Sequence, residues 1–397
     1  MNLTLKLSKI FAILIFANSS IIAQNNSLFN AGFKYSNGFS KISLNGKYGY
    51  INKDGGLAIP FNFDYSNDFT ENFAVARKGK KYGVIASNGL PIVDFKYDYI
   101  ENFSNGLALV KIDNKFGFIN QKGVEVIPAK FNFAMSFNEE LAAVEIEGKY
   151  GFIDSRGEII IEPSYSFTTP FSNGLAAVKI DDKYGFINTK GKLVIEPKYE
   201  MASVFTNGLA TVKLNGKTGL INKKNKEVAS FEYENIGQFT NDIAVFSKNG
   251  KFGILNSKGE EILSDYQYIE ESSEGLLAFK QFGLWGFMDQ KGKAIVDPIF
   301  ESIRSFSDGM AVVSVNKRYG YIDNKGKLVI PIIYDKAIDF SEGFGAVKYG
   351  DSYIFIDKNS KEKIELTLDA KIKDQVIVKV INNEIDTNTL ISSIALD

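Results

Sequence analysis

The chain of 397 residues contains no cysteine and no histidine, and Trp285 is its only tryptophan. Most zinc sites need thiolates or imidazoles, and Cys-His and Ser-His-Asp catalysis need the same residue types. The absence of cysteine also excludes a disulfide framework and attachment through a lipidated cysteine. We therefore predict that the protein is not an enzyme, that it has no catalytic or metal-binding residues, and that it needs no cofactor.

An excess of one charge is absent as well, since 46 basic and 47 acidic side chains leave a formal net charge of −1. Both signs are scattered along the chain, so there is no basic stripe to follow a nucleic-acid backbone. The apolar fraction of 45%, with 13% aromatic residues, is sufficient for a packed interior. We predict a folded protein with no nucleic-acid partner.

The N-terminal segment contains only a short apolar run, Ile10 to Ala17, which follows Lys6 and Lys9. A polar break and a small residue, Ala23, come next, as is typical of a secretory signal peptide. The run of eight residues is far shorter than the ~20 needed to span a bilayer. We predict a signal peptide at residues 1–23, export to the periplasm, cell surface or medium, and no membrane span after its removal.

A glycine recurs every 34 residues along most of the chain, with a single step of 33 between Gly253 and Gly286. The series is Gly49, Gly83, Gly117, Gly151, Gly185, Gly219, Gly253, Gly286 and Gly320. A sustained period of this length indicates a repeat architecture. Helical repeats share the period, but a 3.6-residue hydrophobic pattern is missing and Gly or Pro interrupts the chain about every eight residues. The repeats are therefore predicted to be strands.

The unit at residues 184–217 shows the expected strands and turns. Asn215-Gly216 between two strand-like runs predicts a type I′ hairpin, and Asn188-Thr-Lys-Gly191 predicts a type I turn. The third strand, 192–195, is followed by Pro197, which suits a strand end or a sheet edge. Prolines at the same place are Pro163, Pro298 and Pro331. We predict a three-stranded antiparallel meander with a short fourth segment around 201–205.

Two positions of the unit are predicted to form the core, because apolar side chains recur there in nearly every unit. The first holds Ile51, Ile85, Ile119, Ile153, Ile187, Ile221, Leu255, Met288, Ile322 and Ile356. The second holds Tyr35, Phe69, Phe103, Phe137, Phe171, Phe205, Phe239, Phe306 and Phe340. A single unit cannot cover both faces of its small sheet, so the units must stack on one another.

The units resemble WG repeats, in which an aromatic-Gly pair is followed by a strand, a D/N-x-x-G turn, an apolar strand and an F-S-x-G-L-A-x-V segment. The matching stretches are Trp285-Gly286, Tyr150 to Asp154, Phe103 to Ala108 and Phe171 to Val178. The aromatic residue before the glycine is Tyr or Phe in most units, and it is Thr218 in one. The resemblance implies an exported or surface-exposed interaction protein and brings no catalytic motif.

The predicted organisation is all-β. A short lead at residues 24–34 precedes an array of about ten units at 35–357, and residues 358–397 form a β-rich cap or tail. We expect a closed β-propeller-like ring first, because successive small antiparallel sheets with Gly-rich turns close well in that way. Ten units exceed the usual four to eight blades, so an open superhelical array is the alternative. Atypical first and last units are expected to act as caps.

Symmetry breaks are the places to look for a ligand. Unit seven is one residue short and contains the run Glu270 to Glu274, with Ser273 where Phe is usual. Acidic groups such as this run and Glu139-Glu140 are potential Ca²⁺ ligands, although solvated loops are the favoured interpretation. Trp285 is predicted to be core. Lysines in the second turn are predicted to be solvent-exposed: Lys122, Lys190, Lys258, Lys291 and Lys325.

Three functions remain open from the sequence, and no ligand-binding residue can be assigned. The first hypothesis is a non-enzymatic scaffold that binds a protein. The alternative is a glycan-binding module, which the abundant aromatic residues favour. The least favoured is a hydrolase that uses two carboxylates, which would have to lie about 5–9 Å apart in a cleft.

Overall fold

A two-residue hairpin lies between the second and third strands of each sheet. In the turn between β22 (Leu209–Leu214) and β23 (Lys217–Asn222), φ is 51° at Asn215 and 75° at Gly216, as a type I′ turn requires. The strands pair in register from Leu214↔Lys217 to Leu209↔Asn222. Positive φ also occurs at both central residues of the other predicted hairpins: Asn45-Gly46, Asp113-Asn114, Glu147-Gly148, Asp181-Asp182 and Asn249-Gly250. These predictions are confirmed, including the one at Glu147.

The second predicted turn connects the third strand to the fourth. Between β19 (Lys183–Asn188) and β20 (Leu193–Tyr199), Oδ1 of Asn188 accepts hydrogen bonds from the backbone N–H groups of Lys190 and Lys192, both at 3.0 Å. Gly191 closes the turn with φ of 75°. The turn lysines named above are exposed, as predicted.

The fourth strand continues through the proline rather than ending at it. In β20, Ile195 faces Phe186 and Tyr199 faces Tyr184, so four residues of β20 span two residues of β19 and form a bulge. This strand is the edge of its sheet and needs no donor at Pro197. The sheet-edge interpretation of the prolines is therefore correct, and the strand-end interpretation is wrong.

The bulge explains the glycine that defines the repeat. A Cβ atom on Gly185 would lie 2.5 Å from the carbonyl oxygen of Ile195 and 2.9 Å from the nitrogen of Pro197. Backbone occupies this space, so no side chain fits without a shift of the bulged strand. The spacing of the glycines therefore records a close backbone approach at every glycine of the series except Gly219, where the ring of Phe231 lies closest.

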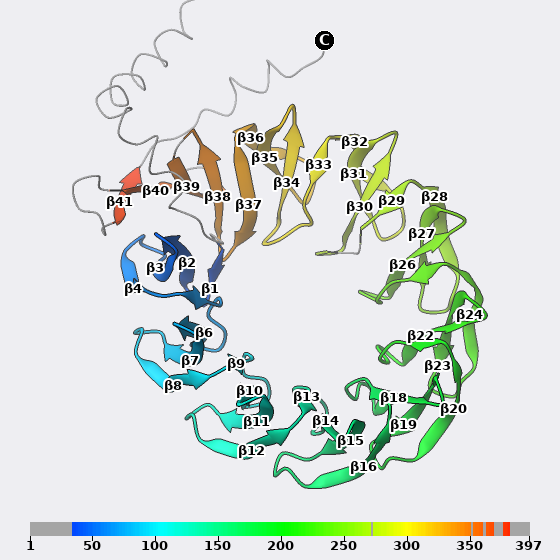
Figure 1. The fold of residues 1–397 in the computed structure, drawn as a ribbon. Coiled ribbons are helices and arrows are strands. Elements are labelled where there is room, and N and C mark those ends of the chain that lie inside the picture. Colours follow the sequence, from blue (N-terminus) through cyan, green and yellow to red (C-terminus); the bar gives the residue numbers. More distant parts are fainter. Residues whose placement is uncertain (1–33, 271–272, 351, 360–362, 369–375, 382–397) are drawn as a thin grey trace, which may run out of the picture.

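The described residues, 34–270, 273–350, 352–359, 363–368 and 376–381 of the computed structural model, form ten antiparallel sheets around one axis (Figure 1). Blade 1 consists of β1 (Tyr35–Ser36), β2 (Phe39–Leu44), β3 (Lys47–Asn52) and β4 (Leu57–Phe63); blade 2 of β5 (Tyr65–Ser66), β6 (Phe73–Lys78), β7 (Lys81–Ala86) and β8 (Pro91–Tyr97); blade 3 of β9 (Tyr99–Ile100), β10 (Leu107–Ile112), β11 (Lys115–Asn120) and β12 (Glu125–Phe131); blade 4 of β13 (Phe133–Ala134), β14 (Ala142–Ile146), β15 (Lys149–Ile153) and β16 (Ile159–Tyr165); and blade 5 of β17 (Phe167–Thr168), β18 (Leu175–Ile180), β19 and β20.

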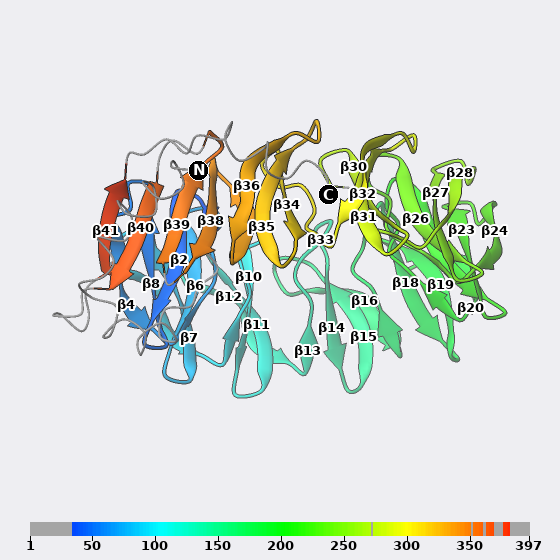
Figure 2. The ribbon, with the colours of Figure 1, turned by 90° about the horizontal axis from the view of Figure 1, so that it is seen from above.

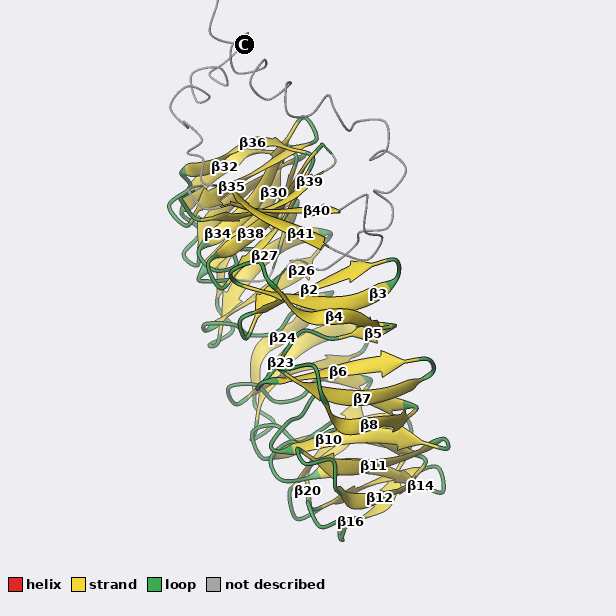
Figure 3. Cartoon of the chain, turned by 90° about the vertical axis from the view of Figure 1, so that its left-hand side faces the viewer, coloured by secondary structure: helices red, strands yellow, loops and turns green. Residues whose placement is uncertain are grey.

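Blade 6 consists of β21 (Met201–Ala202), β22, β23 and β24 (Glu227–Tyr233); blade 7 of β25 (Asn235–Ile236), β26 (Ile243–Lys248), β27 (Lys251–Asn256) and β28 (Glu261–Tyr266); blade 8 of β29 (Tyr268–Ile269), β30 (Leu276–Gln281), β31 (Leu284–Asp289) and β32 (Ala294–Phe300); blade 9 of β33 (Ser302–Ile303), β34 (Met310–Val315), β35 (Arg318–Asp323) and β36 (Leu328–Tyr334); and blade 10 of β37 (Lys336–Ser341), β38 (Phe344–Tyr349), β39 (Ser352–Asp357), β40 (Lys363–Leu368) and β41 (Val376–Ile381). All described elements are strands (Figure 3), so the fold is an all-β ten-bladed β-propeller.

The sequence repeat and the blade are out of phase. Residues 184–217 supply β19 and β20 of blade 5 and then β21 and β22 of blade 6. The predicted short segment around 201–205 exists, but it is the first strand of the following sheet. Each blade therefore has at least four strands instead of the predicted three. The predicted signal peptide lies outside the described residues, and the boundary at residue 357 falls inside the sheet of blade 10.

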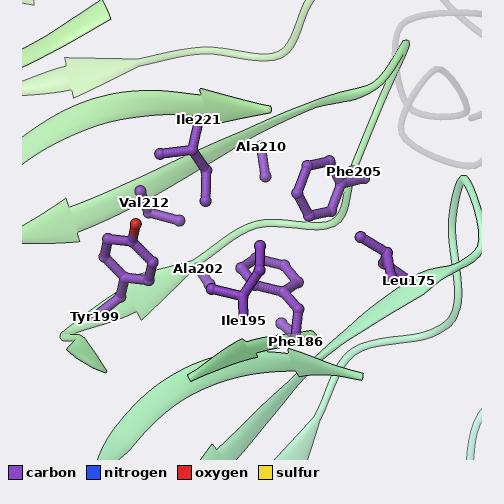
Figure 4. Packing of buried hydrophobic residues seen from close by; sticks show 10 residues of the cluster. Leu175, Phe186, Ile195, Tyr199, Ala202, Phe205, Ala210, Val212 and Ile221 are labelled. Atoms are coloured by element: carbon purple, nitrogen blue, oxygen red, sulfur yellow. The ribbon is translucent and has the colours of Figure 1, made fainter. Parts of the chain in front are cut away.

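The core lies between blades rather than within them. Ten clusters of buried side chains occur, one at each interface between adjacent blades. Between blades 5 and 6, the ring of Phe186 lies 4.8 Å from that of Phe205, edge to face (Figure 4). Both predicted core positions are buried throughout, except that Phe103 is half-buried. This arrangement confirms that the units stack.

Within the described part of the chain, the ring closes without exchanging a strand between its two ends (Figures 1 and 2). Between blades 5 and 6, Ser172 Oγ donates to the carbonyl of Phe205 at 2.6 Å, and between blades 10 and 1, Ser341 Oγ donates in the same way to Tyr35. The ring of Tyr35 lies 5.4 Å from that of Phe355 in the shared cluster. The open superhelical alternative is therefore excluded.

A second hydrogen bond of the repeat also occurs at the interface between blades 10 and 1, called here the seam. The backbone N–H of Gly38 donates to Glu342 at 3.0 Å, as that of Gly174 donates to Glu139 at 2.8 Å. Burial alone would raise the pKa of Glu342, but hydrogen bonds from Lys53 and Gly38 hold this pKa below its ordinary value. Glu342 therefore contributes to the free energy of unfolding above its unfolded-state pKa of about 4.3. This contribution is lost as the pH falls through the lower pKa of the folded state.

We expect Gly185→Ala to lower the free energy of unfolding by about 1–3 kcal/mol, because the new Cβ meets backbone. Gly219→Ala is the matched control, since its Cβ would lie 2.8 Å from the ring of Phe231, a side chain that is able to rotate. Chemical denaturation of both variants measures the difference. Equal losses would contradict the close-approach explanation.

We expect Tyr35→Ala and Phe205→Ala each to cost about 3–5 kcal/mol, because each removes a large buried ring. Only Tyr35 joins blades that the chain itself does not connect. Hydrogen exchange should therefore show early loss of protection in β1–β4 and β37–β39 for Tyr35→Ala alone. The same pattern in both variants would show that the seam is no weaker than the other interfaces.

Candidate functional site

The topology gives the ring two different ends. The two-residue turns of all blades lie at one end, called here the hairpin end, because each joins the second strand to the third. The first strand begins at the same end: Phe167 pairs with Lys179, which pairs with Tyr184 just after the turn. The D/N-x-x-G turns lie at the opposite end, called the Asx end.

Aromatic rings at the hairpin end form a row that runs around the ring. Phe167 of blade 5 lies 6.1 Å from Tyr150 of blade 4 and 6.1 Å from Tyr184 of its own blade. This aromatic row has three continuous segments: Tyr48-Tyr65-Tyr82-Tyr99, Phe116-Phe133-Tyr150-Phe167-Tyr184, and Phe252-Tyr268-Trp285. The exposed fractions are 38% for Tyr65, 42% for Tyr99, 38% for Phe167 and 41% for Tyr268.

Trp285 belongs to this row, and its predicted place in the core is correct only in part, because it packs against the cluster between blades 8 and 9 without being fully buried. The side chain is half-buried, with its ring 5.6 Å from that of Tyr268 and the ammonium of Lys280 5.6 Å from its centre. The residue before the repeat glycine lies near the hairpin turn, where its side chain is only partly buried. The sequence pattern does not distinguish that environment from a closed interior.

Phe282 is the feature that the sequence interpretation missed. It occupies the first central position of the hairpin between β30 and β31, is 87% exposed, and has φ of 53°. Asn or Asp is preferred at such a position because an aromatic side chain disfavours left-handed backbone. The signal was present in the sequence, since Phe282-Gly283 stands where Asn215-Gly216 stands two units earlier.

The acidic groups proposed as Ca²⁺ ligands have another role. The carboxylate of Glu139 accepts the N–H of Gly174, and that of Glu274 accepts the N–H of Gly309 at 2.9 Å. Both bonds cross a blade interface. Within the described residues, no three acidic side chains gather to hold a metal ion.

Ser273 does not occupy the Phe position of its unit, contrary to the prediction. Its Oγ donates to the carbonyl of Phe306 at 2.6 Å, the role that Ser172 has in blade 5. The missing residue lies earlier, in β28, where Tyr266 pairs with Phe252 and Asp265 has φ of 74°. The sequence repeat therefore assigns the Phe position to residue 272, which is outside the described residues.

A cavity of about 360 Å³ lies between blades 7 and 8, beside this irregular strand. Phe246 and Phe252 of blade 7 and Tyr268 and Glu270 of blade 8 line it. Glu270 is half-buried, and desolvation raises the pKa of its carboxyl. An adjacent hollow shares Glu270 and Ser305 and contains Asp339.

Two substitutions in the repeat leave room for the cavity. Asn235 begins the first strand of blade 7, where blades 2 to 5 begin with Tyr65, Tyr99, Phe133 and Phe167. Gly237 follows two residues later, at the position of Glu101 in blade 3 and Met135 in blade 4. The cavity is thus a place where the repeat lacks side chains that other blades have.

These observations define the protein as a ten-bladed propeller with two chemically different ends. Nine consecutive segments match the WG containing repeat, at residues 48–82, 82–116, 116–150, 150–184, 184–217, 219–252, 252–284, 285–319 and 319–353. The chain therefore belongs to the WG containing repeat family. Among curated proteins, none matches the chain.

Solved structures show only distant similarity. A eukaryotic initiation factor has 9% identity and a TM-score of 0.41, with 79% of this chain and 91% of that chain covered. Kluyveromyces lactis Hsv2 has 9% identity and a TM-score of 0.30, with 63% and 97% covered. The extracellular domain of a putative one component system from B. thetaiotaomicron has 10% identity and a TM-score of 0.26, with 91% and 72% covered. Scores this low support no functional argument.

We expect Phe282→Asn to raise the free energy of unfolding by about 1 kcal/mol, because Asn tolerates left-handed backbone. The reciprocal change in blade 7, Asn249→Phe, should lower it by a similar amount. Thermal unfolding of both variants tests this. A loss of stability in Phe282→Asn would mean that the ring of Phe282 stabilises the fold.

Proposed function

We propose that this chain is an exported, non-enzymatic interaction protein whose hairpin end binds a protein partner. The observation that carries the proposal is Phe282, an aromatic side chain that is 87% exposed on a left-handed turn. Such a residue contributes little to folding, whereas exposed aromatic anchors commonly dominate the energy of protein interfaces. The neighbouring row supplies further half-exposed rings, among them Trp285 three residues away.

Export rests on the signal-peptide pattern at residues 1–23. The described part of the chain contains no helix long and apolar enough to cross a membrane. The partner would therefore be met in the periplasm, at the cell surface or in the medium.

A glycan-binding function is the second candidate, and the exposed faces of Tyr65, Tyr99, Phe167 and Tyr268 favour it. Flat apolar rings with a polar hydroxyl suit ligands that are apolar on one face and polar at the edge. The hydrolase hypothesis gains no comparable support. Of the two described carboxylates at the cavities, Asp339 is held by Lys34 at 2.8 Å and by Arg304 at 3.3 Å.

Site-specific photo-cross-linking tests the proposed function. A cross-linking residue at position 282 reports on the hairpin end, and one at position 190 reports on the Asx end. In envelope and medium fractions, we expect a discrete protein adduct from position 282 and none from position 190. Adducts from both ends, or from position 190 alone, would contradict the proposed surface.

The same partner should bind Phe282→Asn at least about tenfold more weakly than the wild type, as expected for an interface anchor. Lys190→Ser is the control on the exposed turn of the Asx end and should bind unchanged. If no adduct forms but a glycan array gives a signal that depends on Tyr65 or Tyr99, the glycan-binding alternative replaces the protein-binding one.

A further inference from the structure

We propose that the cavity between blades 7 and 8 is a binding site for a small organic cation of the alkylammonium class. This cavity is called here the Glu270 cavity. Its lining includes Asn235, Gly237, Phe246, Phe252, Tyr268 and Glu270. This inference does not depend on the protein partner proposed above.

The interface between blades 7 and 8 also differs from the other interfaces in its core. The clusters at the other nine interfaces each contain an aromatic ring at the second core position, such as Phe205 between blades 5 and 6. Among the described residues, the cluster between blades 7 and 8 contains no ring at that position. Asn235 and Gly237 line the cavity at positions where several other blades have larger side chains. The recess of about 360 Å³ is therefore a local departure from the regular repeat, of a size that suits a small ligand.

The walls have the chemistry that recognises an organic cation. The rings of Phe252 and Tyr268 lie 4.7 Å apart at 59°, so they meet at an angle rather than stacking flat. Phe246 contributes a third ring to the lining. The negative faces of aromatic rings attract ammonium groups, and more strongly when water is excluded.

Glu270 supplies the charge, and within the described residues its carboxylate has no hydrogen-bond or salt-bridge partner. By contrast, Glu101 at the equivalent position of blade 3 accepts hydrogen bonds from Ser136 and from the hydroxyl of Tyr99. Lys34 and Arg304, which line the adjacent hollow with Glu270, are both bound to Asp339. Partial burial of a carboxylate without a counter-charge costs free energy of desolvation, and a bound cation would offset that cost.

A metal ion does not fit these observations. Calcium takes six to eight oxygen ligands, whereas Glu270 is the only carboxylate that the described residues contribute to the lining of the cavity. The volume also lies at the lower end of the range for small-molecule pockets, roughly 300–1,000 Å³. Aromatic walls with one carboxylate therefore indicate an alkylammonium group rather than a bare ion.

Titration with choline and with its neutral isostere 3,3-dimethyl-1-butanol tests the proposal. Trp285 contacts Tyr268 and is the only tryptophan, so its fluorescence reports on the cavity, and calorimetry provides an independent reading. We expect saturable choline binding, with the isostere at least tenfold weaker. Absence of saturable choline binding, or equal affinity for the two compounds, would overturn the proposal.

Variants locate the site. Glu270→Gln should weaken choline binding at least tenfold, whereas Glu101→Gln, its matched control in blade 3, should bind normally. Gly237→Met should abolish binding by filling the recess, with retained folding, since Met135 occupies that position in blade 4. Phe282→Asn should bind choline normally, so failure of the proposed protein interface leaves this result unchanged. Unaltered choline binding in Glu270→Gln or Gly237→Met would refute the assignment.

Discussion

The whole structure depends on one constraint: no blade of this protein is able to bury its own faces. Each small sheet leaves apolar side chains on both sides. The preceding blade covers one side and the following blade covers the other. The interlocking rings of Phe186 and Phe205 show how this is done, with one residue from each of two blades. Because the chain also passes between blades within every repeat, packing and connectivity reinforce each other at nine of the ten interfaces. Packing, hydrogen bonds and ion pairs hold the interface between blades 10 and 1 without that connection.

Local backbone conformation was predictable from the sequence wherever only a few residue types adopt the required conformation. The turn at Asn215-Gly216 and the glycine at position 185 are of this kind, because positive φ and close backbone approach select few residues. Burial of the two core positions was equally predictable, since apolar identity recurred there. The closed ring was the first expectation and is confirmed, but the sequence left the open array as an alternative. Closure depends on the small rotation between neighbouring blades, and no single residue type encodes that angle.

The candidate site was only partly predictable. The missing residue of unit seven correctly drew attention to the run that begins at Glu270, but the carboxylates of that run have different roles. Glu274 accepts a backbone N–H across an interface, whereas Glu270 lines a cavity. Spacing along the chain does not separate these roles, because both depend on what the neighbouring blade places opposite. The exposed ring of Phe282, in contrast, was visible as a Phe-Gly pair at a position where Asn-Gly is expected.

The phase difference between repeat and blade has an evolutionary consequence. A repeat that begins in the middle of one sheet and ends in the middle of the next joins two blades. Duplication or loss of such a segment in the gene would add or remove two half-sheets that complete each other, so no strand would be left without a partner. The half unit at the start of the array supplies β1 and β2, and the final unit supplies the third strand of blade 10, so both terminal sheets stay complete. Unequal recombination within such a gene would change the number of blades by whole blades. The residues that form each interface would be inherited together.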